Sequence, residues 1–270
     1  MRVAHTPDAD DAFMFYAMTN GKIPVSFEIE NVVEDIESLN RKAFMGEYEV
    51  TALSVHAYAY VADRYRLLSA GASVGDGYGP VVVSKEDLSL KNATVAVPGK
   101  LTTACLLLKL AIDAKTVEMR FDRILDAVKK DEVQAGLLIH EAQLSYEDHG
   151  LKKVLDLYEW WHSKTGLPLP LGVNAIRRDL SLELQREFLR AMKRSIKYAL
   201  ENPEEALNYA QRYARGLSRE RLKKFVLMYV NDYTLEMPEK VLKAIDLLFE
   251  MAEERGIVKK PPLDVLRDVD

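Results

Sequence analysis

The feature that most constrains the fold is the alternation of short strand-like runs with helical patterns over the first two-thirds of the chain. The apolar run at residues 50–54 follows an amphipathic stretch at 35–45, and residues 25–30 alternate apolar and polar side chains as a half-buried strand does. A second series begins near residue 93 and includes the apolar run 135–139. Strands that alternate with helices form a sheet that the helices cover, so we predict an α/β protein.

The last third of the chain has a purely helical pattern. We predict helices there at residues 181–200, 203–214, 218–230 and 238–254. Pro203 and Pro238 each stand at the start of one of them, where a helix needs no backbone N–H from its first residue. These helices are expected to complete a lobe that the first strands begin.

We predict two lobes with a cleft between them. The first lobe comprises residues 1–84 and 178–270, the second comprises residues 90–172, and the chain crosses between them at 85–89 and 173–177. In open α/β proteins, ligands bind in the crevice beyond the carboxyl ends of the strands. Polar residues that follow a strand are therefore the first candidates for a site.

Composition excludes several kinds of partner. The net charge is −5 and basic residues are interspersed with acidic ones, whereas a nucleic-acid binder carries a basic face. No run approaches the roughly 20 apolar residues that cross a bilayer, and the first residues contain no apolar leader. The single cysteine, Cys105, lies in an apolar run, and no Cys/His cluster suits a metal. We expect a cytoplasmic protein for a small, anionic molecule, with no nucleic-acid partner and no membrane insertion.

Residues 98–103, Pro-Gly-Lys-Leu-Thr-Thr, follow a predicted strand and open an apolar helix. Thr102 or Thr103 can cap this helix, and the free N–H groups of its first turn suit a carboxylate or phosphate. An ordinary capped helix has the same sequence, and the Gly-x-x-x-x-Gly-Lys spacing of a phosphate-binding loop is absent. We take Thr102 and Thr103 as candidate contacts for an anionic substrate.

Three acidic residues, Asp8, Asp10 and Asp11, follow the first predicted strand. A phosphatase nucleophile of the Asp-x-Asp type would need its first Asp at the strand end, but Pro7 intervenes. A calcium loop counted from Asp8 lacks the Gly and Glu that its sixth and twelfth positions require. We expect the acids to cap the following helix and complement its dipole, with Asp11 able to face the cleft and contact a substrate.

The segment Ser54-Val55-His56 ends another predicted strand. Ser54 stands where the strand gives way to a helix, so its hydroxyl can contact a ligand. His56 is a second candidate contact, although it can equally serve packing, as can Tyr58 and Tyr60. We count Ser54 and His56 among the expected substrate-binding residues.

His140 comes directly after the apolar run 136–139, where a buried strand ends. A side chain at that point stands in the crevice, and an imidazole with a reference pKa of about 6.5 suits proton transfer near neutral pH. A His-Glu-x-x-His zinc motif needs a second His where Leu144 and Ser145 stand. The position alone leaves a structural and a catalytic role open.

Three stretches of the chain resemble the 1,4-dihydroxy-6-naphthoate synthases, enzymes of the futalosine route of menaquinone biosynthesis. They are residues 6–15, residues 50–58 and the run Gly-Leu-Leu-Ile-His-Glu-Ala-Gln-Leu-Ser-Tyr at 136–146. The resemblance extends over nearly the whole chain. It implies a two-lobed fold like that of type II periplasmic binding proteins, with a central cleft between the lobes and without export.

The resemblance also implies an activity. The family's enzymes are carbon–carbon lyases that open cyclic dehypoxanthinyl futalosine and release the naphthoate without a metal or redox cofactor. The position that matches their proposed general base is His140. Those that match substrate contacts are Ser54, Thr102 and Thr103, and Asp11 matches an acid near the cleft.

This chain departs from the family pattern near its start. Thr6 replaces the usual Ser, and Asp8-Ala9-Asp10 differs from the commoner Cys-Pro-Asn form. Two other functions remain open. One is the sister activity on the same fold, chorismate dehydratase, whose pattern lacks the residue that matches His140. The other is a non-catalytic solute-binding protein for an aromatic carboxylate.

Overall fold

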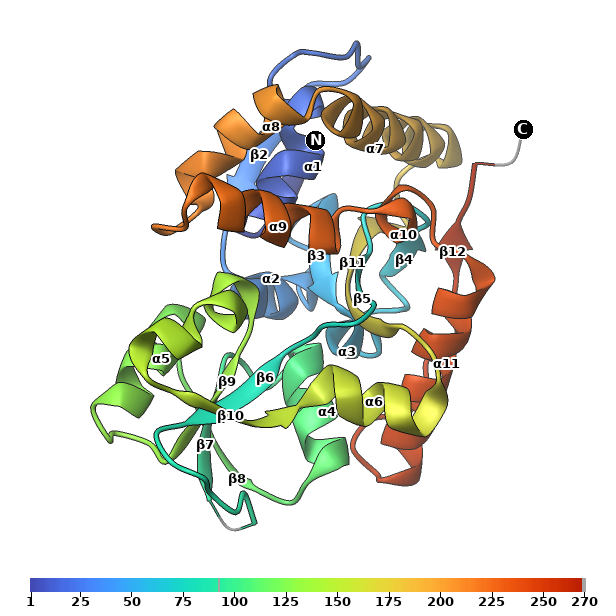
Figure 1. The fold of residues 1–270 in the computed structure, drawn as a ribbon. Coiled ribbons are helices and arrows are strands. Elements are labelled where there is room, and N and C mark those ends of the chain that lie inside the picture. The colour runs from blue at the N-terminus through green and yellow to red at the C-terminus, as the bar shows by residue number, and fades with distance from the viewer. Residues whose placement is uncertain (92, 269–270) are drawn as a thin grey trace.

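The structure, a computed structural model, describes residues 1–91 and 93–268. Its first sheet combines strands from both ends of the chain (Figure 1). The strands are β1 (Arg2–His5), β2 (Glu30–Val33), β3 (Val50–Ser54), β4 (Tyr65–Leu68), β5 (Ser73–Gly75), β11 (Leu169–Arg177) and β12 (Val265–Leu266). Their order is β12–β4–β11–β3–β1–β2, with β5 attached to β11. β1 is parallel to both β2 and β3, so the carboxyl ends of β1 and β3 meet at one edge.

The second sheet uses only the middle of the chain. Its strands are β6 (Val81–Ser84), β7 (Thr94–Val97), β8 (Lys115–Glu118), β9 (Ala135–Leu138) and β10 (Lys152–Asp156). They lie in the order β10–β6–β9–β7–β8. β7 is parallel to β8 and β9, whereas β6 is antiparallel to both of its neighbours. The carboxyl ends of β7 and β9 therefore also meet at one edge.

Helices cover both sheets, which confirms the predicted α/β class. Those around the second sheet are α4 (Thr103–Ala111), α5 (Phe121–Lys129), α6 (Leu157–Thr165), η1 (His140–Leu144) and η2 (Tyr146–His149). The others are α1 (Ala9–Thr19), α2 (Ile36–Ala43), α3 (Val55–Tyr58), α7 (Leu182–Glu201), α8 (Pro203–Ala210), η3 (Gln211–Tyr213), α9 (Arg219–Tyr229), α10 (Asp232–Leu235) and α11 (Glu239–Glu254). We call the parts around the two sheets the first and the second lobe.

Helix α1 forms the core of the first lobe. All of its residues from Ala9 to Met18 are buried, and it contacts α7, α8 and α9 (Figure 1). A helix that is covered on every side carries apolar side chains around its circumference, as Phe13, Met14 and Phe15 show. This packing fixes the N-terminal end of α1, and with it the acidic residues that begin the helix.

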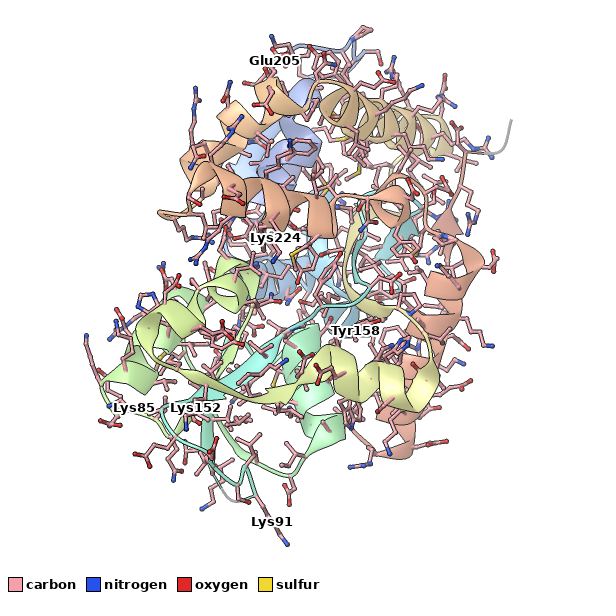
Figure 2. All side chains as sticks on the ribbon, in the orientation of Figure 1. Lys85, Lys91, Lys152, Tyr158, Glu205 and Lys224 are labelled. Atoms are coloured by element: carbon pink, nitrogen blue, oxygen red, sulfur yellow. The ribbon has the colours of Figure 1, made fainter. Side chains whose placement is uncertain are left out.

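Charged side chains stand on the outside of both lobes. Figure 2 shows Glu205, on α8, at one end of the molecule and Lys91 at the other end. Within the described residues, we find no helix that combines the length and apolar character needed to cross a membrane.

Three of the predicted helices are confirmed as α7, α9 and α11. The fourth, predicted at 203–214, ends earlier, because α8 stops at Ala210 and continues as the short turn η3. The strand predicted at 25–30 is wrong, since the strand there is β2 at Glu30–Val33. Phe27 and Ile29 pack on the core beside it instead. The alternation of apolar and polar residues at 25–30 reflects this packing. A strand forms only further along, where residues 30–33 pair with β1.

The predicted lobe boundaries differ from the sheets at two points. Residues 81–84 were expected in the first lobe, but they form β6 in the second sheet. Residues 169–172 were expected in the second lobe and 173–177 as a crossover, yet all of them belong to β11 in the first sheet. An apolar run can pair in either sheet, and only its neighbours in space decide which. The division into lobes that move as units stays a prediction.

Candidate active site

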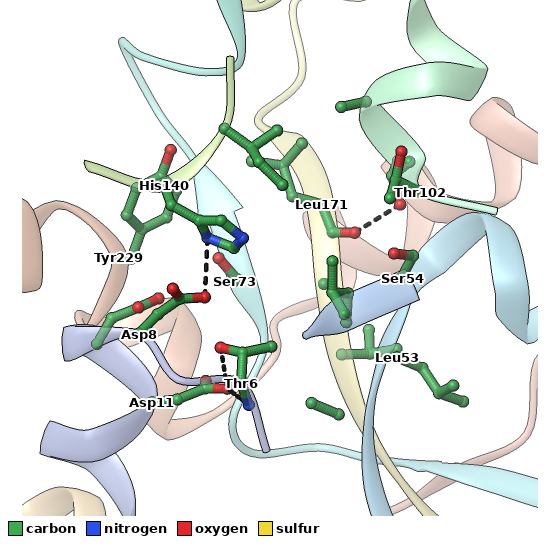
Figure 3. A pocket seen from close by; sticks show the side chains of 18 of the residues that line it. Thr6, Asp8, Asp11, Leu53, Ser54, Ser73, Thr102, His140, Leu171 and Tyr229 are labelled. Atoms are coloured by element: carbon green, nitrogen blue, oxygen red, sulfur yellow. Dashed lines mark hydrogen bonds and ion pairs between the residues drawn. The ribbon is translucent and has the colours of Figure 1, made fainter. Parts of the chain in front are cut away.

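A cavity lies between the edges at which β1 and β3 of the first sheet and β7 and β9 of the second sheet end (Figure 3). Its volume is about 110 Å³. Both lobes and the connecting strand β11 line it. The polar residues of its wall are Thr6, Asp8, Asp10, Asp11, Ser54, Ser73, Thr102, Thr103, His140, Gln143, Asn174 and Tyr229. Five of the six predicted site residues are thus brought together, the exception being His56.

His140 stands at the end of β9, as predicted, and projects into this cavity. Its backbone has φ +57°, the left-handed region that side chains other than glycine rarely adopt. With the Gln143 amide nitrogen directed to the Gly79 carbonyl, the Gln143 oxygen accepts a hydrogen bond from the His140 backbone N–H at 3.0 Å. The imidazole and the Phe121 ring form a T-shaped pair, with 4.9 Å between the centroids. These contacts hold the unusual backbone in place.

The His140 imidazole is paired with a buried carboxylate. Its Nδ1 lies 2.9 Å from Oδ2 of Asp8. Burial by itself would lower the pKa of His140, but the charge of Asp8 and the hydrogen bond to it outweigh burial and raise that pKa above its ordinary value. Burial works against ionisation of Asp8 too, yet His140 and Arg215 hold the pKa of Asp8 well below its usual range. The pair is therefore an ion pair when His140 is protonated.

Arg215 reaches this pair from the loop that follows η3. Its guanidinium donates to Oδ1 of Asp8 at 2.8 Å, to Oε2 of Glu141 at 2.6 Å and to the Pro7 carbonyl at 2.6 Å. It also lies over the Phe121 ring, 4.6 Å from the centroid. Glu141 therefore contacts Arg215, and the carboxylate that bonds to His140 is that of Asp8.

The acids at the start of α1 do not have the capping role that we predicted. Asp8 is the N-cap residue, but its side chain accepts no hydrogen bond from α1 within the described part of the chain. It is turned to His140 and Arg215, because these cations attract it more strongly than a backbone N–H. Oδ2 of Asp11 accepts hydrogen bonds from the backbone N–H and the hydroxyl of Thr6, both at 2.7 Å. Burial raises the pKa of Asp11.

Asp10 lies in the same wall and differs from its neighbours. Its Oδ1 is buried without a hydrogen-bond partner among the residues that the structure describes. Burial and the nearby charges of Asp11 and Asp8 raise its pKa well above the ordinary value. A carboxyl group in this state can donate a hydrogen bond to a polar group in the cavity.

Ser54 stands on the opposite side of the cavity from His140 (Figure 3). Its hydroxyl oxygen accepts a hydrogen bond from the Asn40 amide at 3.0 Å, and its backbone N–H donates to the same amide at 2.9 Å. Asn40 is fully buried on α2. No sequence signal marked Asn40 as part of the site.

Thr102 and Thr103 begin α4, as predicted, but their hydroxyl groups serve the fold. Thr102 caps the helix by accepting from the Cys105 N–H at 3.2 Å, and it donates to the Gly99 carbonyl at 2.8 Å. The Thr103 hydroxyl donates to the Leu171 carbonyl at 2.6 Å. The backbone N–H groups of Thr103 and Ala104 lie in the first turn, where a helix has no internal acceptors for them. These N–H groups, rather than the hydroxyls, can receive an anion.

His56 does not line the cavity in the part of the chain that the structure describes. It is buried beside Tyr60, and both ring nitrogens lack a hydrogen-bond partner among the described residues. Burial lowers its pKa to about 4. Because it is buried and does not line the cavity, His56 fits the packing role better than ligand contact.

Arg215 and Asn40, which hold Asp8 and Ser54, escaped the sequence analysis, as did the wall residues Ser73, Asn174 and Tyr229. Arg215 and Asn40 do not follow a strand, and each meets its partner only through the fold. Across residues 1–91 and 93–268, no group of three or more His, Cys, Asp or Glu side chains has a metal-binding arrangement.

The fold and the place of the cavity define a class of protein. The chain superposes on the alkanesulfonate-binding protein of Xanthomonas axonopodis pv. citri, determined with bound MOPS, with a TM-score of 0.72. The match covers 99% of this chain and 98% of that one at 13% sequence identity, so it concerns the fold alone. The chain has a two-lobed α/β fold like that of type II periplasmic binding proteins, with the cleft between the lobes, as predicted.

More similar proteins place the chain in a family. The family model for menaquinone biosynthesis matches residues 1–254. A 1,4-dihydroxy-6-naphthoate synthase of Thermus thermophilus is 45% identical over 264 residues, which is 97% of each chain. A crystal structure of a protein from Archaeoglobus fulgidus is 66% identical with a TM-score of 0.94, over 95% of this chain and 98% of that one. The chain belongs to the menaquinone biosynthesis family, which confirms the resemblance seen in the sequence.

Proposed function

We propose that this protein is a carbon–carbon lyase that converts cyclic dehypoxanthinyl futalosine to 1,4-dihydroxy-6-naphthoate in menaquinone biosynthesis. Membership in the family and the name of the Thermus thermophilus relative support the reaction. The observation that carries the proposal is His140, which faces a cavity whose opposite wall holds Ser54 and the first turn of α4. We further propose that the enzyme acts in the cytoplasm on this small, anionic substrate and needs no metal or redox cofactor.

The substrate's carboxylate suits the wall opposite His140. The first turn of α4 offers the N–H groups of Thr103 and Ala104 and the positive end of the helix dipole. Ser54 adds a hydroxyl whose oxygen is already held by Asn40, so its proton can be donated. Anchoring the aromatic acid there directs the sugar-derived part of the substrate toward His140.

His140 is the general base of the proposed reaction. Its Nδ1 is engaged by Asp8, which leaves Nε2 to remove a proton from the sugar-derived portion. Loss of that proton starts the cleavage of the carbon–carbon bond that frees the naphthoate. Closure of the lobes around the substrate keeps water away from the intermediate.

Product analysis tests the proposed reaction. Purified protein incubated with cyclic dehypoxanthinyl futalosine is expected to release 1,4-dihydroxy-6-naphthoate, detected by mass spectrometry. Unchanged substrate would overturn the proposal. If chorismate is dehydrated instead, the protein has the sister activity. If the substrate or an aromatic carboxylate binds without turnover, the protein is a binding protein.

The base assignment is tested by His140→Asn, which keeps a polar side chain of similar size but cannot accept the proton. Because a positioned base contributes about 10²- to 10⁴-fold, we expect kcat to fall by about 100-fold or more. The matched control is His162→Asn on the outer face of α6, where the imidazole is exposed. Equal kcat in wild type and His140→Asn would refute the assignment.

A further inference from the structure

We propose that Asp8 is a positioning residue for His140: it fixes the imidazole with its proton on Nδ1 and its lone pair on Nε2, facing the cavity. The expected effect of Asp8 on the reaction rate rests on the proposed function. The pairing of Asp8 with His140 does not. It concerns a residue at which this chain departs from the commoner family sequence, so the family resemblance assigns it no role.

The geometry of the pair supports this role. Oδ2 of Asp8 lies 2.9 Å from Nδ1, and the Asp8 side chain is only 3% exposed. Since an ionised carboxylate can only accept a hydrogen bond, the neutral imidazole must carry its proton on Nδ1. Figure 3 shows the other ring nitrogen on the side of the imidazole away from Asp8. The nitrogen that faces the cavity is therefore the one that can take up a proton.

The other oxygen of Asp8 is fixed separately. Oδ1 accepts from Arg215 at 2.8 Å, and Arg215 is itself anchored to the Pro7 carbonyl and to Glu141. The two oxygens of one carboxylate thus bind two different groups, the His140 imidazole and the Arg215 guanidinium, which restricts the orientation of the Asp8 side chain.

The backbone of His140 supplies an independent sign that the residue is held for a purpose. The His140 φ of +57° lies in the left-handed region that residues other than glycine rarely adopt, and such strain gathers at functional sites. In this conformation the imidazole lies within hydrogen-bond distance of Asp8.

Several charged or titratable groups face the imidazole, and they determine the expected pH dependence. Asp8 and Asp10 come from α1, Glu141 from η1, Arg215 from the loop after η3, and Tyr229 from α9. Asp8 is the anion in direct contact. Removing its charge should lower the pKa of His140, because protonated His140 then loses its counter-ion.

The test is Asp8→Asn, which keeps the size of the side chain but removes its charge and lets its amide donate to Nδ1. We expect kcat to fall at least about tenfold with KM changed less than about twofold, since the wrong tautomer impairs proton removal but not binding. The acidic limb of the profile of kcat/KM against pH should move to lower pH. Asp8→Glu, which restores a carboxylate, should recover part of both effects.

Arg215→Gln should shift the acidic limb in the direction opposite to Asp8→Asn. It removes a positive charge near the imidazole, so protonated His140 becomes more favourable and the acidic limb should move to higher pH. The matched control is Asp131→Asn, an exposed carboxylate paired with Lys85 within the second lobe, which should leave the limb in place. A merely structural role for Asp8 would lower the melting temperature of Asp8→Asn without moving the limb.

A second measurement separates this inference from the proposed function. Nitrogen-15 NMR of the histidine rings, with His140 identified by the signals lost in His140→Asn, reports which ring nitrogen carries the proton above its pKa. We expect Nδ1 to carry it in wild type and Nε2 in Asp8→Asn, even if the protein made no naphthoate. An unchanged tautomer, or an unchanged limb together with unchanged kcat, would overturn the role of Asp8.

Discussion

Asn40 holds Ser54 with both ends of its amide, at 3.0 Å and 2.9 Å. Because the Ser54 oxygen already accepts one bond, its own proton can be given to a ligand. Ser54 could be predicted from the sequence, since it ends an apolar run. Asn40 could not, because 14 residues separate the two and only the packing of α2 on β3 brings them together.

The same distinction applies on the other side of the cavity. His140 could be predicted because an apolar run followed by a polar residue is visible locally. Arg215 could not, since it lies 207 residues from Asp8 and no pattern connects them. The role of Asp8 was mistaken for the same reason: an acid before a helix suggests a cap, and its true partners come from distant segments.

Ser54→Ala tests the proposed carboxylate site. A hydrogen bond to a charged group is worth about 1.5–3 kcal/mol, so we expect KM, or the Kd of the naphthoate product, to rise by roughly 10- to 100-fold while kcat changes little. Titration calorimetry with the product measures this directly. Ser73→Ala is the control, because Ser73 lies on the His140 side of the cavity (Figure 3). Equal losses in both variants would contradict the assignment.

At the scale of elements, a side-chain hydrogen bond joins α4 to β11. The Thr103 hydroxyl donates to the Leu171 carbonyl at 2.6 Å. The cap on α4 could be predicted because capping is local to residues 102–105. The partner of Thr103 could not, because Leu171 belongs to a strand 68 residues later. The wrong strand at 25–30 has the same origin, since pairing depends on a neighbour that the local pattern does not contain.

Thr103→Val removes this hydroxyl while keeping the shape and branching of the side chain. The Leu171 carbonyl loses its donor, so we expect the free energy of unfolding to fall by about 1–2 kcal/mol, measured by urea denaturation. Thr103→Ser keeps the hydroxyl and should lose less. If Thr103→Val instead raised KM and left stability unchanged, the hydroxyl would contact the substrate rather than β11.

At the scale of the whole molecule, the lobes are held close together. Polar contacts cross the cleft between the following pairs: Glu37 and Leu101, Arg41 and Glu118, Arg215 and Glu141, and Arg221 and Asp148. The cavity between them, of about 110 Å³, is smaller than the roughly 300 Å³ or more of usual ligand sites, so we expect the lobes to separate when a substrate enters. Two lobes could be predicted from the sequence because the strand–helix alternation restarts near residue 93. The sequence could not indicate where the chain crosses between the lobes, nor how close together the lobes lie.

Gly99→Ala tests whether close approach of the lobes matters for activity. A Cβ atom at Gly99 would clash with Oε2 of Glu37 and lie 2.7 Å from its Cβ, so the Glu37 side chain cannot escape by rotating its end alone. The lobes should therefore close incompletely, and we expect kcat/KM to fall by about tenfold, equivalent to ~1.4 kcal/mol, with little change in melting temperature. In a Glu37→Gly background the clashing Cβ is absent as well, so the same substitution has room and should add little further loss. An equal loss in both backgrounds would show that Gly99 acts through its own backbone rather than through contact with the first lobe.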